Sequence, residues 1–91
     1  MNIQHDADNQ EFTTSENGHP AELAYSRPDA QTIDFTHTFV DEALRGRGLA
    51  DELARAALIF ARQEGLKVKT SCTFMKGFVE KHATEYKDLA V

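Results

Sequence analysis

The stretch Glu42-Ala43-Leu44-Arg45-Gly46-Arg47-Gly48-Leu49-Ala50 separates a segment of alternating apolar residues from a long amphipathic segment. It brings two glycines and two arginines to the point where a helix is expected to begin. The first amide N–H groups of a helix have no partner within it, and the helix dipole adds partial positive charge there. Because glycine has no Cβ, the backbone can approach a ligand closely at these positions. The stretch therefore predicts an anion site, with a diphosphate as its natural occupant.

Two common nucleotide-binding motifs fail on particular residues. A P-loop requires Lys-Ser or Lys-Thr directly after its glycines, and Lys69-Thr70 has no glycine-rich loop before it. A dinucleotide fingerprint requires a third glycine three residues after the second, and that position is Asp51. A carboxylate there would repel a pyrophosphate. The loop therefore matches neither motif.

Three short strands are predicted in the first part of the chain. Residues 3–6, 10–14 and 21–26 are each bounded by residues that favour turns. The turn at residues 16–20 contains Asn17-Gly18, the strongest short-range signal for a hairpin. A further turn is predicted at residues 27–31.

A fourth strand is predicted at residues 32–40. Along this segment, polar residues alternate with Ile33, Phe35, His37 and Phe39. A period of two marks a strand with one buried face, so His37 is expected on that buried face. Four strands joined by tight turns predict an antiparallel meander.

A helix, a strand and a second helix are predicted to follow. From residue 49 the apolar residues recur at helical spacing, and Gly65 ends the helix. The apolar stripe consists of Leu49, Leu53, Ala56, Ala57 and Phe60. Residues 66–70 predict a strand parallel to the one before the helix, which completes a βαβ unit. Residues 74–82 predict another helix, and residues 84–89 a last turn.

The length and composition predict one domain over residues 1–91. The chain leaves little room for a second core. No run of about eighteen apolar residues is present to span a membrane, and the N-terminus lacks the regions of a secretory signal. The single cysteine, Cys72, cannot form an internal disulfide. A cytoplasmic protein without membrane association is expected, and the sequence does not indicate its oligomeric state.

The charge is unevenly distributed along the chain. Residues 1–44 hold nine acidic side chains and one arginine, whereas residues 45–91 hold nine basic and six acidic side chains. The basic half contains the predicted phosphate loop, which fits an anionic cofactor, and the acidic half can steer a cationic co-substrate. The alternative is that both halves are ordinary solvated surfaces. No basic stripe with interleaved aromatic residues is present, so no nucleic-acid binding is expected.

The loop also matches the signature of an acyl-transfer family. Arg45-x-x-Gly48-x-Ala50 resembles the Arg/Gln-x-x-Gly-x-Gly/Ala motif of the GCN5-related N-acetyltransferase (GNAT) superfamily. The loop is preceded by the strand at residues 33–40 and followed by Cys72-Thr73-Phe74 and by Tyr86-Lys87-Asp88-Leu89. This order of motifs resembles the minimal single-domain branch of the superfamily, and the resemblance covers roughly residues 21–89. The resemblance implies an α+β, GNAT-like fold, an antiparallel meander followed by a βαβ unit. It is a truncated version without the two helices usually found between the first strands, which implies an open cleft and a bulky acceptor or weak small-molecule selectivity.

The resemblance further implies acetyl-coenzyme A as the cofactor. Its pyrophosphate would lie against the loop, and backbone groups on the preceding strand would serve the acetyl and pantetheine arms. The implied cofactor-binding residues are Phe39, Val40, Arg45, Gly46, Arg47, Gly48, Leu49 and Ala50.

Two side chains are candidates for catalysis. His37 can act as a general base, directly or through water, or it can be a buried histidine bonded to a backbone carbonyl. Cys72 can be an acyl-accepting nucleophile or a small packing residue. Tyr86 is the phenol available to protonate the leaving thiolate, although packing against the main helix is the simpler role. No spacing of His, Cys and carboxylates predicts a metal site.

These expectations describe an acetyl-CoA-binding N-acetyltransferase that transfers acetyl to an amine acceptor, either a small molecule or a protein side chain. Three alternatives stay open. The protein could be a coenzyme A-binding module without turnover, an interaction domain without the cofactor, or an acyltransferase that prefers a longer acyl chain.

Overall fold

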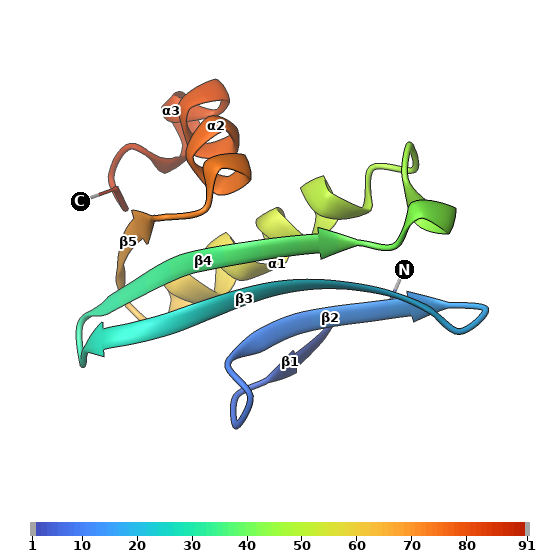
Figure 1. Cartoon of the computed structure of the whole chain (residues 1–91). Helices are drawn as coiled ribbons and strands as arrows, with labels where there is room; N and C mark the ends of the chain where they lie inside the picture. The colour runs from blue at the N-terminus through green and yellow to red at the C-terminus, as the bar shows by residue number, and fades with distance from the viewer. Residues whose placement is uncertain (1, 91) are drawn as a thin grey trace.

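Five strands form one sheet in chain order. The computed structural model describes residues 2–90, so that Met1 and Val91 at the ends of the predicted domain lie outside the described residues. The strands are β1 (Gln4–Asp6), β2 (Glu11–Glu16), β3 (His19–Asp29), β4 (Thr32–Val40) and β5 (Lys67–Thr70) (Figure 1). The first four pair antiparallel, and β5 pairs parallel to β4. The predicted meander followed by a βαβ unit is confirmed.

The helices gather on one side of this sheet (Figure 1). They are the 3₁₀ turn η1 (Glu42–Leu44) and the helices α1 (Leu49–Gln63), α2 (Thr73–Lys81) and α3 (Ala83–Tyr86). Helix α1 contacts β2, β3 and β4, whereas α2 contacts α1, β4 and β5. Near the C-terminus, the amide of Val68 donates to the carbonyl of Leu89 at 2.8 Å, which ties the end of the chain to the outer edge of β5.

The core lies between the helices and one face of the sheet. Its largest fully buried side chains are Phe35, Leu23, Ile33, Leu49, Leu53, Leu58 and Met75. Burial of such a side chain stabilises the fold by about 1.5–3 kcal/mol. The buried stripe of α1 differs slightly from the predicted one, because Ala54, Leu58 and Ala61 are buried while Ala56 and Phe60 are only partly covered.

The hairpin between β2 and β3 has the turn that its sequence predicts. Asn17 and Gly18 have φ values of 53° and 80°. Two consecutive residues with positive φ form the type of turn whose twist matches that of the flanking strands. The short turn allows β3 to begin at His19 and to run to Asp29, which is longer than the predicted strand at residues 21–26.

Strand β4 contains one extra residue at one point of its pairing with β3. Ala24 pairs with His37, but the next residue of β3, Tyr25, pairs with Phe35. Thr36 is therefore a β-bulge, the extra residue in β4 that has no partner on β3.

The bulge reverses the face on which the following residues of β4 lie. Thr38 pairs with the buried Leu23 and so lies on the core face, whereas His37 and Phe39 lie on the opposite face and are exposed. The prediction that His37 lies on the buried face is wrong, because it assumed an uninterrupted period of two along the strand.

The other face of the sheet, called the open face below, is not covered by any helix. Its residues are Gln4, Asp6, Glu11, Thr13, Ser15, Glu22, Ala24, Ser26, Asp34, His37, Phe39, Lys67 and Lys69, and none of them is buried. Among residues 2–90, no helix occurs between the first strands. The absence of helices there leaves this face of the sheet accessible.

An aromatic cluster closes the β1 edge of the core. The His5 ring stacks on Phe12 with centroids 4.3 Å apart, and its Nε2 lies 2.6 Å from the Tyr25 hydroxyl. Phe60 of α1 packs edge-on against His5 at 4.5 Å. Burial lowers the pKa of His5 below its ordinary value, although the carboxylates of Asp6 and Glu64 oppose this shift.

We expect acidification to destabilise the protein through His5. Because the folded-state pKa is depressed, the unfolded chain binds more protons as the pH falls through 6.5, so the free energy of unfolding decreases. This decrease should be smaller in His5→Gln. Urea unfolding of both proteins between about pH 7.5 and about pH 5 measures the difference. Equal slopes in the two proteins would contradict the assignment to His5.

Candidate functional site

The loop between β4 and α1 is anchored at its start by Asp41. The Asp41 carboxylate accepts a hydrogen bond from the amide of Ala43 at 2.9 Å and thereby caps η1. The Asp41 amide donates to the carbonyl of Pro20 at 3.0 Å, and Leu44 is buried in the core. Sequence reasoning missed Asp41, although aspartate before a short helical segment is a known capping signal.

Two glycines give the loop its course into the helix. Gly46 and Gly48 have φ values of 82° and 74°, in the left-handed region that side chains rarely adopt. A Cβ built on either glycine would meet no heavy atom within 4 Å. The backbone therefore borders open space at both positions.

The amide groups of this loop form the most distinctive feature of the site. Within residues 2–90, no hydrogen bond uses the backbone N–H of residues 46–51 as its donor, and the first helical bond runs from the Glu52 amide to the Gly48 carbonyl. Consecutive unpaired donors at a helix N-terminus attract an anion, and the dipole of α1 adds to this attraction.

A shallow cavity of about 180 Å³ lies against the loop. It is lined by Val40, Leu44, Arg45, Gly46, Gly48, Leu49, Ala50 and Asp51. Six of the eight residues predicted to hold the cofactor therefore lie around one cavity. The other two do not line it: Phe39 lies on the open face, and the Arg47 side chain is directed to another partner.

The two arginines of the loop contact other parts of the chain. Arg47 forms an ion pair with Glu16 at the end of β2, with 2.9 Å between Nη1 and Oε2, and both side chains are largely exposed. Arg45 donates from Nε to the carbonyl of Val40 at 3.3 Å. Arg45 therefore borders the cavity, whereas Arg47 would have to leave Glu16 to contact a ligand there.

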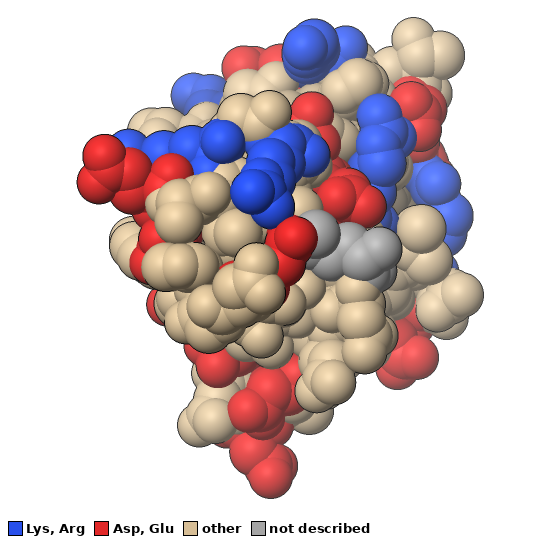
Figure 2. Space-filling model, turned by 90° about the vertical axis from the view of Figure 1, so that its right-hand side faces the viewer, with Lys and Arg blue, Asp and Glu red and all other residues tan. Residues whose placement is uncertain are grey.

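The basic side chains are unevenly placed on the surface (Figure 2). In this view of the end that carries the loop, Lys and Arg side chains lie in the upper part, where acidic side chains are interspersed with them, whereas the lower part shows only acidic and neutral ones. The upper part holds the helices, and the lower part holds β1 and β2. The uneven charge of the sequence therefore becomes a mixed helical side, which carries the cations, and an acidic strand side.

A second hollow of about 300 Å³ lies between α1 and α2. Its lining residues are Asp51, Thr73, Phe74, Gly77, Phe78, Lys81 and His82. Asp51 also borders the loop cavity, so the two hollows meet at this residue. Lys81 and Phe74 give the second hollow a cation and an aromatic ring, features that sequence reasoning did not single out.

Strands β4 and β5 separate beyond Phe35. Their pairing ends with Phe35 and Thr70, whereas β4 continues to Val40. The Phe35 carbonyl still accepts a hydrogen bond from the Cys72 amide at 2.8 Å. The backbone of β4 from the bulge to Val40 therefore has no partner strand on this side.

The two predicted catalytic side chains lie on opposite sides of the sheet, one on each side of β4. Cys72 is 8% exposed at the start of α2, with its Sγ 3.2 Å from the Thr38 hydroxyl on the core face. His37 is exposed on the open face, and within residues 2–90 its ring forms no hydrogen bond. The structure does not bring the two side chains together, and the alternative of a His37 bonded to a backbone carbonyl is not observed.

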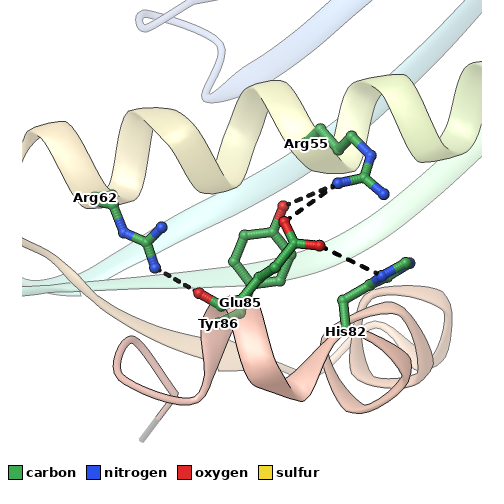
Figure 3. A network of polar contacts seen from close by, with 5 residues as sticks. All are labelled: Arg55, Arg62, His82, Glu85 and Tyr86. Carbon is green, nitrogen blue, oxygen red and sulfur yellow. Dashed lines mark hydrogen bonds and ion pairs between the residues drawn. The ribbon is translucent and has the colours of Figure 1, made fainter.

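Tyr86 belongs to a network that holds α3 against α1 (Figure 3). Its ring is buried, and its hydroxyl lies 3.5 Å from Nη1 of Arg55. Arg55 also pairs with the Glu85 carboxylate at 3.5 Å, and Arg62 donates to the Glu85 carbonyl at 2.7 Å. Packing against the main helix, the simpler of the two roles predicted for Tyr86, is therefore what the structure shows.

Two further findings concern the described residues. Nowhere in residues 2–90 do three His, Cys, Asp or Glu side chains come together as a metal site. Each helix in this part of the chain is too short or too polar to cross a membrane.

Comparison with known proteins identifies the family. The model of the GCN5-related N-acetyltransferase family matches residues 11–89, a stretch that includes the loop, both cavities and both candidate catalytic residues. The chain belongs to this family.

Individual relatives agree with this assignment. Protein NATD1 of Homo sapiens is 36% identical over 84 residues, which cover 90% of this chain and 74% of that protein. Protein NATD1 of Xenopus tropicalis is 34% identical, with 90% of this chain and 77% of that protein covered. The solution structure of a GCN5-like protein from Staphylococcus aureus superimposes with a TM-score of 0.77 at 32% identity, and covers 99% of this chain and 87% of that chain. The truncated GNAT fold is therefore shown.

We expect Glu16→Gln to strengthen the binding of inorganic pyrophosphate to the loop. The change removes the carboxylate that holds Arg47 and leaves its guanidinium available to a phosphate. Since an exposed ion pair contributes little, the affinity should rise by at most about fivefold. Isothermal titration calorimetry measures the change.

Glu80→Gln, on the exposed surface of α2, is the matched control because it removes the same charge away from the loop. Arg47→Gln should weaken pyrophosphate binding. Equal affinities in Glu16→Gln and Glu80→Gln would show that Arg47 does not contact the anion.

Proposed function

We propose that the protein binds acetyl-coenzyme A through residues 45–50 and transfers the acetyl group to an amine acceptor. The observation that carries this proposal is the run of unpaired amides at residues 46–51 beside a cavity at the N-terminus of α1. Such an arrangement suits the two phosphates of the coenzyme A diphosphate. Membership of the GNAT family supports the same cofactor and the same reaction type.

The second hollow has a chemistry that suits the nucleotide end of the cofactor. Lys81 would hold the 3′-phosphate of the adenosine, and Phe74 offers a ring against which a base can stack. The two hollows meet at Asp51, so one ligand can extend from the loop to α2. The carboxylate of Asp51 carries the same sign of charge as the phosphates and would keep them on the glycine side of the cavity.

The chain supplies a base for the transfer. When bound, acetyl-coenzyme A supplies a thioester: the acceptor nitrogen forms a bond with its carbonyl carbon, and the carbon–sulfur bond breaks. His37 takes the proton that the amine loses, directly or through water, and the released thiolate takes a proton in turn. The Asp41 amide points to β3, so the Val40 amide points to the side on which β4 has no partner strand, beyond the end of the β4–β5 pairing. There it would stabilise the negative charge on the carbonyl oxygen.

Direct transfer is favoured over a covalent acyl-cysteine route. Cys72 is buried on the core face and lies against Thr38, whereas His37 faces the solvent on the other side of β4. A base on one face cannot serve both an amine on the open face and a thiol inside the core. The reduced, buried state of Cys72 also suits the cytoplasm, which we propose as the compartment.

Coenzyme A binding can be read from amide NMR spectra. We expect shifts at residues 39–40 and 44–50 during a coenzyme A titration, because the phosphates replace water on the unpaired amides. Unchanged spectra at millimolar ligand would exclude the cofactor and leave an interaction domain.

The role of Lys81 is tested by comparing coenzyme A with dephospho-coenzyme A, which lacks the 3′-phosphate. Lys81→Gln should weaken coenzyme A binding by roughly threefold to tenfold and leave the affinity for dephospho-coenzyme A unchanged, because a charge-assisted contact is lost only from the first ligand. Lys76→Gln, an exposed lysine of α2 outside the hollow, should affect neither ligand. Equal losses for both ligands in Lys81→Gln would contradict the contact.

His37→Gln should lower kcat by about a hundredfold or more at neutral pH, with coenzyme A affinity unchanged, since general bases contribute about 10²–10⁴-fold. Thiol release from acetyl-coenzyme A with a lysine peptide as acceptor measures the rate, and added imidazole should restore part of it. Cys72→Ala should keep its turnover. An acetylated protein in mass spectra, together with loss of turnover in Cys72→Ala, would instead establish the covalent route.

A further inference from the structure

The strand register arranges the open face around β4 in two rows. In one row, Thr13, Glu22 and Phe39 are neighbours across β2, β3 and β4. In the next row, Glu11 and His37 lie on either side of Ala24. Asp6 of β1 pairs with Glu11 and extends this second row. Asp6, Glu11 and Glu22 therefore lie in the same two rows as His37 and Phe39, whereas the β5 edge of the open face carries Asp34, Lys67 and Lys69.

These three carboxylates have no cationic partner in the described part of the chain. The ion pairs within residues 2–90 involve other acidic side chains, and Asp6 accepts hydrogen bonds only from the neutral Asn9. Burial, together with the carboxylates of Glu22 and Asp6, raises the pKa of Glu11. The charges on this surface thus repel one another, and a bound cation would relieve the repulsion.

Phe39 gives the same surface an apolar element. Its side chain is 39% exposed. Within residues 2–90, Phe39 and Ile59 are the two large hydrophobic side chains that are exposed. It lies beside Glu22 in the first row and on the same strand as His37. A lysine side chain matches this pair, because its aliphatic stem packs on apolar surface while its ammonium group stays near a carboxylate. A nucleic acid would be repelled by the uncompensated negative charge.

The part of the open face over β1 to β4 is wide. No helix within residues 2–90 covers it, and its residues come from four neighbouring strands. A small amine would bury little of its surface there, whereas an extended peptide can cross several strands and place further cations over Asp6, Glu11 and Glu22. The strand that carries Phe39 and His37 is also the one that separates from β5 beside the cavity, so the surface adjoins the region of acetyl transfer proposed above.

We propose that the open face over β1 to β4 docks a basic segment of another protein and that a lysine of this segment is the acetyl acceptor. The inference rests on the proposed function and names its substrate class. The acidic row holds the flanking cations of the segment, Phe39 supports the lysine stem, and His37 faces the ammonium group that must lose a proton.

The probe for this proposal is a short synthetic peptide with one lysine among arginines and glycines. We expect amide shifts on the open face at residues 11, 22, 24 and 37–39, which weaken as salt is added. Glu11→Gln and Glu22→Gln should each lower the peptide affinity about twofold to fivefold. Glu80→Gln, on the exposed surface of α2, should leave it unchanged. With acetyl-coenzyme A present, Glu22→Gln should raise the KM for peptide acetylation.

Three outcomes would overturn the proposal. The protein could bind a peptide with glutamates in place of the arginines as tightly as the basic peptide, or it could bind spermidine more tightly than the basic peptide. The amide shifts caused by the basic peptide could also be confined to the helices. A coenzyme A titration of the same samples separates the two hypotheses. If the loop responds to coenzyme A and the open face does not respond to the peptide, the docking surface is wrong and the cofactor site stands. If the loop does not respond, the proposed function is wrong.

Discussion

Thr36 forms a bulge in β4, opposite β3, and the arrangement of the functional side chains depends on it. Before the bulge, Ile33 and Phe35 enter the core; after it, Thr38 lies on the core face and His37 on the open face. The parallel pairing with β5 ends at the same place. One inserted residue therefore moves an imidazole from the core into solvent, at the point where β4 also loses its parallel neighbour.

The loop that follows is held in place by contacts at both of its ends. The backbone N–H groups of residues 46–51 have no partner within the described chain, and all of these residues except Leu49 are at least partly exposed, so water can satisfy them. Asp41 and Leu44 fix the start of the loop, and Leu49 and Leu53 bury the first turns of α1. The core thus holds these amides at the surface, where an anion can replace the water.

Local signals predicted most of the fold. The Asn17-Gly18 turn, the amphipathic pattern of α1 and the glycine loop each depend on neighbouring residues, so the sequence alone reveals them. The bulge at Thr36 could not be predicted in this way, since threonine at that position continues the alternating pattern and only the register with β3 shows the insertion. The ion pair between Arg47 and Glu16 joins residues far apart in the chain and was missed for the same reason.

The small size of the fold gives the two proposed substrates different electrostatic surroundings. The proposed cofactor region has Arg45 and Lys81 beside it, and the open face carries Asp6, Glu11 and Glu22 of the first strands. In a larger protein, helices over the open face would wall an acceptor site and select its shape; here that face has no cover, and selection has to come from charge and from the few side chains near Phe39. Charge attracts from a distance but discriminates weakly between similar cations. The docking proposed for the open face would therefore select a class of basic segments rather than one shape of molecule, and the proposed base His37 would provide the chemical precision from its position on β4.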